Sequence, residues 1–120
     1  MPKETELLRL AELETPNVLA SLKELTSHDS GTGQAQGMLK VVEWIEQFGQ
    51  QLGAQTERIT PFANVVGPNV ALVFKGQGKR NFLLIAHMDT VYPTGTASAR
   101  PFRIEGSRAI ALGIADDKGE

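Results

Sequence analysis

The chain has 120 residues, no cysteine and a net charge of −2 from 12 basic and 14 acidic side chains. This length suits one domain with a single core, and the lack of cysteine excludes disulfides and thiolate metal ligands. There is no basic cluster, and no apolar run approaches the roughly 20 residues that span a bilayer, so we expect neither a nucleic-acid nor a membrane partner. Residues 1–6 are polar, unlike a secretory leader, so we expect a cytoplasmic protein.

The first half of the chain is predicted to form three helical segments. Two short ones meet at Thr15 and Pro16, because threonine suits an N-cap and proline suits the first turn of a helix. A loop rich in turn residues follows over 27–33. The third and strongest segment, over 34–52, repeats apolar residues on one helical face, and Gly53 suits the position after its end.

The second half is predicted to contain the strands. We expect them over 55–60, 69–74 and 82–86, and the last of these has the apolar composition of a strand buried on both faces. A five-residue turn with two glycines, 76–80, fits an antiparallel pairing of the second and third strands. A short hairpin is expected over 102–111. The fold class is therefore α/β, with helices packed on a mixed sheet and residues 1–120 forming one unit.

A histidine and an aspartate follow the apolar run 82–86. His87 and Asp89 are two positions apart, so on a strand they project to the same face. Asp89 could then accept one imidazole N–H while the other ring nitrogen binds a metal. In the alternative interpretation His87 ends a strand and Asp89 starts a turn, and the motif by itself gives the two about equal weight.

A second acidic motif, Asp116 and Asp117, follows a loop near the end of the chain. In the functional interpretation Asp116 bridges two metal ions, because a carboxylate has two oxygens and can span metals about 3.5–4 Å apart. In the structural one the pair caps a helix. Taken alone, this motif favours the cap. His28 and Lys118 are expected to be surface residues.

Three blocks taken together resemble the co-catalytic zinc aminoacylase/carboxypeptidase family. They are His-Met-Asp-Thr-Val-Tyr at 87–92, Arg-Pro-Phe-Arg-Ile-Glu-Gly at 100–106 and Gly-Ile-Ala-Asp-Asp-Lys-Gly at 113–119. That family includes bacterial glutamate carboxypeptidases, acetylornithine deacetylases and succinyl-diaminopimelate desuccinylases. The chain looks most similar to the folate-cleaving glutamate carboxypeptidases, and the resemblance covers nearly its whole length, including Gly-Thr-Gly at 31–33.

The resemblance implies a role for three residues. His87 would be a ligand to one zinc, Asp116 would bridge both zincs of the complete enzyme, and Asp89 would be the catalytic-site acid that orients His87. It also implies a metallo-exopeptidase or amidohydrolase that cleaves an amide next to a C-terminal amino acid. The substrate would be a small peptide or an N-acyl amino acid.

Some parts of the family pattern have no counterpart in the sequence. The general base and the remaining ligands come later in the family, whereas this chain stops at Glu120. The resemblance therefore implies a partial catalytic domain, truncated before the rest of the sheet and the lid domain and inactive alone, with a homodimer possible only for the full-length protein. The alternative is a non-catalytic α/β module that keeps the scaffold.

One substitution within the matched blocks concerns the backbone. Ala111 stands where the family usually has glycine. If that position requires a positive φ, alanine there costs about 1 kcal/mol and could shift the loop that carries Asp116.

Overall fold

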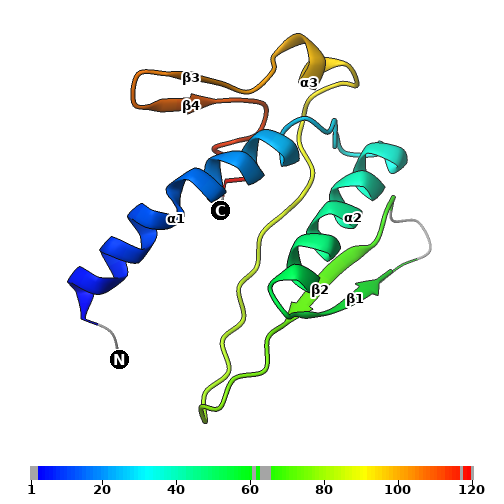
Figure 1. The fold of residues 1–120 in the computed structure, drawn as a ribbon. Coiled ribbons are helices and arrows are strands. Elements are labelled where there is room, and N and C mark those ends of the chain that lie inside the picture. Colours follow the sequence, from blue (N-terminus) through cyan, green and yellow to red (C-terminus); the bar gives the residue numbers. More distant parts are fainter. Residues whose placement is uncertain (1–2, 61, 63–65, 117, 120) are drawn as a thin grey trace.

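The computed structural model describes residues 3–60, 62, 66–116 and 118–119. The elements in chain order are α1 (Glu4–Leu25), α2 (Ala35–Gln51), β1 (Gln55–Ile59), β2 (Asn69–Val73), α3 (Thr96–Ala99), β3 (Arg103–Glu105) and β4 (Arg108–Ile110) (Figure 1). Helices and antiparallel strands are thus combined as in part of an α/β domain, as predicted. Both sheets described are two-stranded and antiparallel, so the expected mixed sheet is not seen in these residues. Within the same ranges, no helix has both the length and the apolar character needed to cross a membrane.

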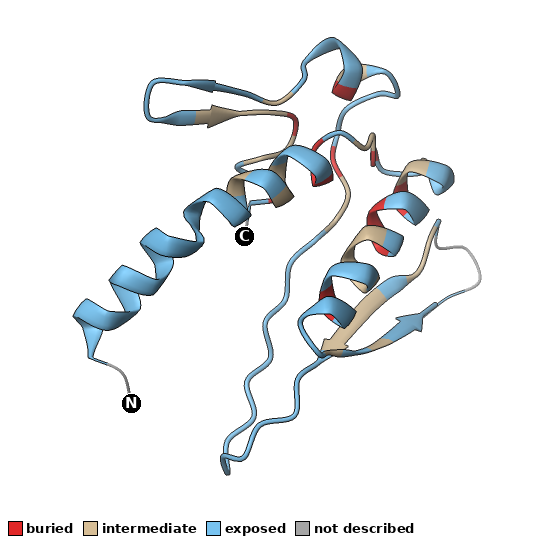
Figure 2. Ribbon diagram, in the orientation of Figure 1, coloured by how far each residue is buried: buried red, intermediate tan, exposed pale blue. Residues whose placement is uncertain are grey.

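The N-terminal helix is continuous, and the predicted division into two helices at Thr15 and Pro16 was wrong. Pro16 lies inside α1. The Thr15 hydroxyl donates to the Ala11 carbonyl over 3.0 Å, instead of capping a new helix. Proline removes one intrahelical hydrogen bond, and this loss is tolerated best where water can reach the backbone. This stretch of α1 is exposed, so water can reach it (Figure 2).

One side of the molecule is a layer formed by α2, β1 and β2 (Figure 1). The strands pair antiparallel, from Gln55 opposite Val73 to Ile59 opposite Asn69. The buried positions of α2 repeat at helical spacing: Met38, Val41, Val42 and Gly49. At Gly49 a Cβ atom would lie 2.6 Å from the Leu72 side chain, so the missing side chain lets α2 approach β2 closely. The structure confirms the predicted helix and the first two predicted strands, which pair with each other.

The predicted strand 82–86 is wrong in this structure, and so is its predicted pairing with β2. The segment follows an extended path that belongs to no strand (Figure 1). Its side chains are largely exposed: Phe82 85%, Leu83 83%, Leu84 93% and Ile85 83%. A strand of this composition needs a partner for its backbone and a covering layer on each face. Among the described residues neither is present, because β2 pairs with β1 alone and the segment 82–86 joins no sheet.

The last elements bring the chain back over the end of α1. The hairpin of β3 and β4 is confirmed, with Arg103 opposite Ile110 and Gly106 at φ 60° in its turn. The preceding loop contains the short helix α3, which the sequence did not predict. Residues 111–119 then return toward the end of α1, where Lys118 contacts the Leu25 carbonyl.

Candidate metal and active site

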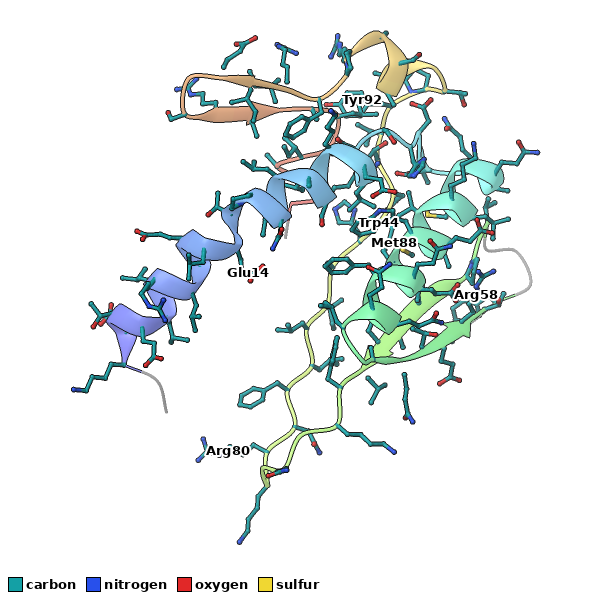
Figure 3. All side chains as sticks on the ribbon, viewed as in Figure 1. Glu14, Trp44, Arg58, Arg80, Met88 and Tyr92 are labelled. Carbon is teal, nitrogen blue, oxygen red and sulfur yellow. The ribbon has the colours of Figure 1, made fainter. Side chains whose placement is uncertain are left out.

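The segment after 82–86 is fixed by the loop between α1 and α2. The Thr90 N–H donates to the Ser30 carbonyl and the Thr32 N–H to the Thr90 carbonyl, each over 2.8 Å, so Gly31 and Thr90 form a parallel bridge. The Ser30 side chain is fully buried and donates to the Met88 carbonyl over 2.9 Å (Met88 is labelled in Figure 3). Hydrogen bonds therefore hold both backbones in register at the point where the candidate ligands begin.

The three predicted site residues lie together. His87 Nε2 is 3.1 Å from Asp116 Oδ1, although the two residues are 29 positions apart in the sequence. His87 Nδ1 faces Asp89, with the backbone oxygen at 3.0 Å and the carboxylate Oδ1 at 3.4 Å. Asp89 is therefore on the expected side of the ring. Its backbone carbonyl lies closer to Nδ1 than the carboxylate that the sequence pattern pointed to.

The neighbours of the ring determine which chemistry it can support. Acceptor oxygens lie beside both ring nitrogens, those of Asp89 near Nδ1 and that of Asp116 near Nε2, so a neutral ring can donate on only one side. With the hydrogen on Nε2 the ring donates to Asp116, and with the hydrogen on Nδ1 the Nε2 lone pair faces that oxygen. Two such acceptors repel each other unless a proton or a metal ion lies between them. Two ligands of one tetrahedral zinc are about 3.4 Å apart, given bond lengths of about 2.1 Å. The observed separation of 3.1 Å therefore fits two ligands of one metal.

The number of ligands limits this fit. Across the described part of the chain, no group of three or more His, Cys, Asp or Glu side chains is placed to hold a metal ion. A catalytic zinc usually has three protein ligands. Asp89 cannot complete the set, because it lies on the opposite side of the His87 ring from Asp116. Asp117, the other acid of the second motif, lies outside the described residues. His87 and Asp116 thus fit as part of a zinc site.

The loop that carries Asp116 is attached to α1 by a buried lysine. Lys118 is only 6% exposed, so its expected surface position was wrong. Its Nζ donates to the His28 carbonyl over 2.8 Å and to the Leu25 carbonyl over 3.4 Å, just after the negative end of the α1 dipole. Burial lowers the Lys118 pKa to about 8, against the opposing effect of the Asp29 charge. Lys118 therefore holds the Asp116 loop against the end of α1.

The backbone of the same loop settles the question about Ala111. Among the residues that the structure describes, every positive φ belongs to a glycine, so Ala111 carries no such strain. The glycine that needs its freedom is Gly113, at φ 66°. Its carbonyl accepts the N–H groups of Asp116 and Lys118. Alanine at 111 therefore leaves the Asp116 loop undisturbed.

Two further residues give the surrounding loops their shape. The Asp29 carboxylate accepts the Gly95 N–H over 2.7 Å and the Ala97 N–H over 2.8 Å, which satisfies the start of α3. The Ala97 N–H lowers the Asp29 pKa, more than burial raises it. His28 is half-buried, less exposed than predicted for a surface histidine, and burial lowers its pKa, assisted by the charges of Lys118 and Lys40. No local sequence pattern indicated these contacts.

A pocket of about 230 Å³ contains the candidate ligands. It is lined by residues from 87–92 and 111–116, including His87, Asp89 and Asp116. Typical small-molecule sites start at about 300 Å³. A larger cavity, about 440 Å³, lies at the start of α2 and contains none of the three site residues. We favour the smaller pocket as the reactive site because it gathers the groups that can bind a metal.

Comparison with known proteins agrees with the resemblance carried by the motifs. The chain is 39% identical over 117 residues to Carboxypeptidase G2 from Pseudomonas sp. (strain RS-16). The match covers 98% of this chain and 28% of that enzyme, so the chain spans little more than a quarter of the length of its relative. No family model matches the sequence. The chain is thus similar, over almost its whole length, to one part of a carboxypeptidase.

Proposed function

We propose that this chain forms part of the catalytic site of a zinc-dependent, glutamate carboxypeptidase-like hydrolase. One observation carries the proposal. His87 Nε2 and Asp116 Oδ1 lie 3.1 Å apart in a shared pocket. The chain that brings them together is 39% identical to a carboxypeptidase. A metal site requires ligand atoms from segments far apart in the sequence to meet, as His87 and Asp116 do across 29 residues. A helix cap has no such requirement.

The proposal assigns roles to the residues of the pocket. His87 and Asp116 would hold zinc, and Asp89 would orient the His87 ring from the Nδ1 side. Zinc in such a site lowers the pKa of a bound water and polarises the scissile carbonyl. The substrate would be a small peptide or an N-acyl amino acid with a C-terminal glutamate, following the resemblance of the motifs to glutamate carboxypeptidases.

We further propose that residues 1–120 by themselves do not turn over such substrates. His87 and Asp116 are two ligands, fewer than the usual three for one catalytic zinc, and a second zinc needs more. A general base is also required to take a proton from the water. Within the described residues, no third ligand joins the pair. Catalytic groups that act as a unit lose most of their effect when one is removed.

A chimera with the relative tests the proposal directly. The matched part of Carboxypeptidase G2 would be replaced by this chain, and glutamate release from an N-acyl glutamate would be measured with zinc present. We expect the chimera to be active. His87→Ala and Asp116→Asn should each lower kcat/KM by at least about a thousandfold. His28→Ala is the matched control, because His28 lies outside the pocket that holds the ligands.

The outcomes separate the two candidate functions. A folded chimera that is as active with His87→Ala as without it would contradict the assigned roles. A folded but inactive chimera that also takes up no zinc would favour the alternative, a non-catalytic α/β module. The low ligand count in the described residues is the observation on which that alternative rests.

A further inference from the structure

Thr32 makes a side-chain contact to the candidate site across 57 residues of sequence. Its hydroxyl lies 2.5 Å from Asp89 Oδ2 and 3.3 Å from the Thr90 carbonyl. A hydroxyl has a single hydrogen to donate, and bonds to a carboxylate are shorter and stronger than bonds to a neutral oxygen. The hydrogen therefore goes to Asp89.

The backbone around Thr32 is held in place by contacts that do not involve its side chain. The Thr32 N–H donates to the Thr90 carbonyl over 2.8 Å, and the preceding Gly31 pairs with Thr90. At Gly31 a Cβ atom would lie 2.3 Å from the Tyr92 carbonyl, so only glycine allows the two segments to lie this close. Threonine is also branched at Cβ, which restricts its χ1 angle. The hydroxyl is therefore presented to Asp89 from a rigid position.

The two oxygens of the Asp89 carboxylate contact different neighbours. Oδ2 accepts from Thr32, and Oδ1 lies 3.4 Å from His87 Nδ1. The opposite ring nitrogen of His87 is 3.1 Å from Asp116. The Asp89 side chain is 38% exposed, so without its donor it is free to turn toward water. A continuous line of contacts thus runs from the first loop to the candidate ligands.

We propose that Thr32 is a positioning residue for this site. Its hydroxyl holds the Asp89 carboxylate in one rotamer 3.4 Å from His87 Nδ1, where its charge adds to the closer contact of the Asp89 carbonyl with that nitrogen, and the two together keep Nε2 turned toward Asp116. The proposal rests on the proposed function only for its consequence at the metal. The rotamer itself is a property of the chain without metal.

The test compares Thr32→Val, which keeps the shape and removes the hydroxyl, with Thr32→Ser, which keeps the hydroxyl. Three-bond scalar couplings measured by NMR on the metal-free chain report the χ1 rotamer of Asp89. We expect a single rotamer in the original chain and in Thr32→Ser, and averaged couplings in Thr32→Val. Thr56→Val is the matched control, because the Thr56 hydroxyl contacts Gln50 on the other side of the fold.

A second measurement, zinc affinity by competition with a chromophoric chelator, reads out the site in the chimera described above, which carries either the original chain or its variants and supplies the ligands that His87 and Asp116 lack. Loss of a contact behind a ligating histidine typically lowers affinity by about 10–100-fold, so we expect about a tenfold loss in Thr32→Val and recovery in Thr32→Ser. Averaged Asp89 couplings in the original chain, or couplings unchanged by Thr32→Val, would overturn the proposal. Equal zinc affinities of the original chain and Thr32→Val would overturn its consequence at the metal. Failure of the active chimera described above would contradict the proposed function and leave the rotamer result standing.

Discussion

The layer formed by α2, β1 and β2 and the loops around the candidate site are held together by different forces. In the layer, apolar side chains such as Val41 and Val42 are almost completely buried against the sheet. The loops 27–34, 87–92 and the described part of 111–119, here called the loop junction, are joined by side chains that bond to distant backbone groups and by the backbone bonds of the bridge at Thr90. Apolar burial is non-directional, whereas a hydrogen bond depends on the distance and the angle between two named groups. The candidate ligands lie in the region whose contacts are directional.

The first and largest predicted effect breaks the contact between the two regions. At Gly37, on α2, a Cβ atom would lie 1.6 Å from the Asp29 carbonyl oxygen, which is backbone and cannot rotate away. Gly37→Ala should therefore lower the free energy of unfolding by about 3 kcal/mol or more, as overpacking does in its severe cases. Chemical denaturation measures it. Gly78→Ala is the control, since nothing lies within 4 Å of its added Cβ atom, and an equal effect of the two would contradict the prediction.

The second prediction uses pH to test the lysine that anchors the loop junction. The pKa of Lys118 is lowered from 10.5 to about 8, so between these values the unfolded chain binds a proton that the folded chain does not. Stability from this group therefore rises as the pH increases through that window, by up to about 3 kcal/mol, because the buried charge is removed. Denaturation at several pH values measures it. Lys118→Met should flatten the rise, and an identical pH dependence in both proteins would contradict the prediction.

The third prediction sharpens the comparison within the loop junction. Ser30 is fully buried, and its hydroxyl is a donor to the Met88 carbonyl. Ser30→Ala should cost about 1–3 kcal/mol, because the partly buried Met88 carbonyl loses a partner. Since the Thr90 N–H bonds to the Ser30 backbone, the bridge should persist. Hydrogen exchange should therefore show the Thr90 amide still more protected than its neighbours, and loss of that protection would mean that the hydroxyl holds the bridge itself.

The smallest predicted effect concerns an exposed ion pair on the layer. Arg58 on β1 (Figure 3) bonds to Glu46 on α2 through two nitrogens, at 2.7 Å and 2.6 Å. Pairs of this kind contribute less than about 1 kcal/mol and are screened by salt. Glu46→Gln should therefore change stability only slightly at low salt, and the difference should vanish at high salt. A large loss that salt does not affect would show that the layer depends on charge as well as on packing.

Local sequence patterns predicted the elements whose signals are themselves local. The 3.6-residue repeat of α2 and the turn at Gly106 were sufficient for that helix and for the hairpin of β3 and β4. The break at Pro16 was wrong because an exposed helix tolerates proline. The prediction of a strand at 82–86 was wrong because its apolar composition is typical of a strand covered on both faces, whereas the described residues leave the segment exposed.

The site was only partly accessible to the same reasoning. Spacing alone related His87 to Asp89, but the approach of Asp116 across 29 residues came from the resemblance to a family. Lys118 and Thr32 reach partners 90 and 57 residues away. No periodicity or turn rule encodes such long-range hydrogen bonds.

The exposed segment 82–86 has a consequence for the self-association of this chain. It lies between β2, which ends at Val73, and the bridge at Thr90. Five consecutive apolar residues without charge or proline, presented as extended backbone, are the composition that favours the addition of strands between molecules. We therefore expect copies of this chain to associate through the segment, and the association to increase with protein concentration.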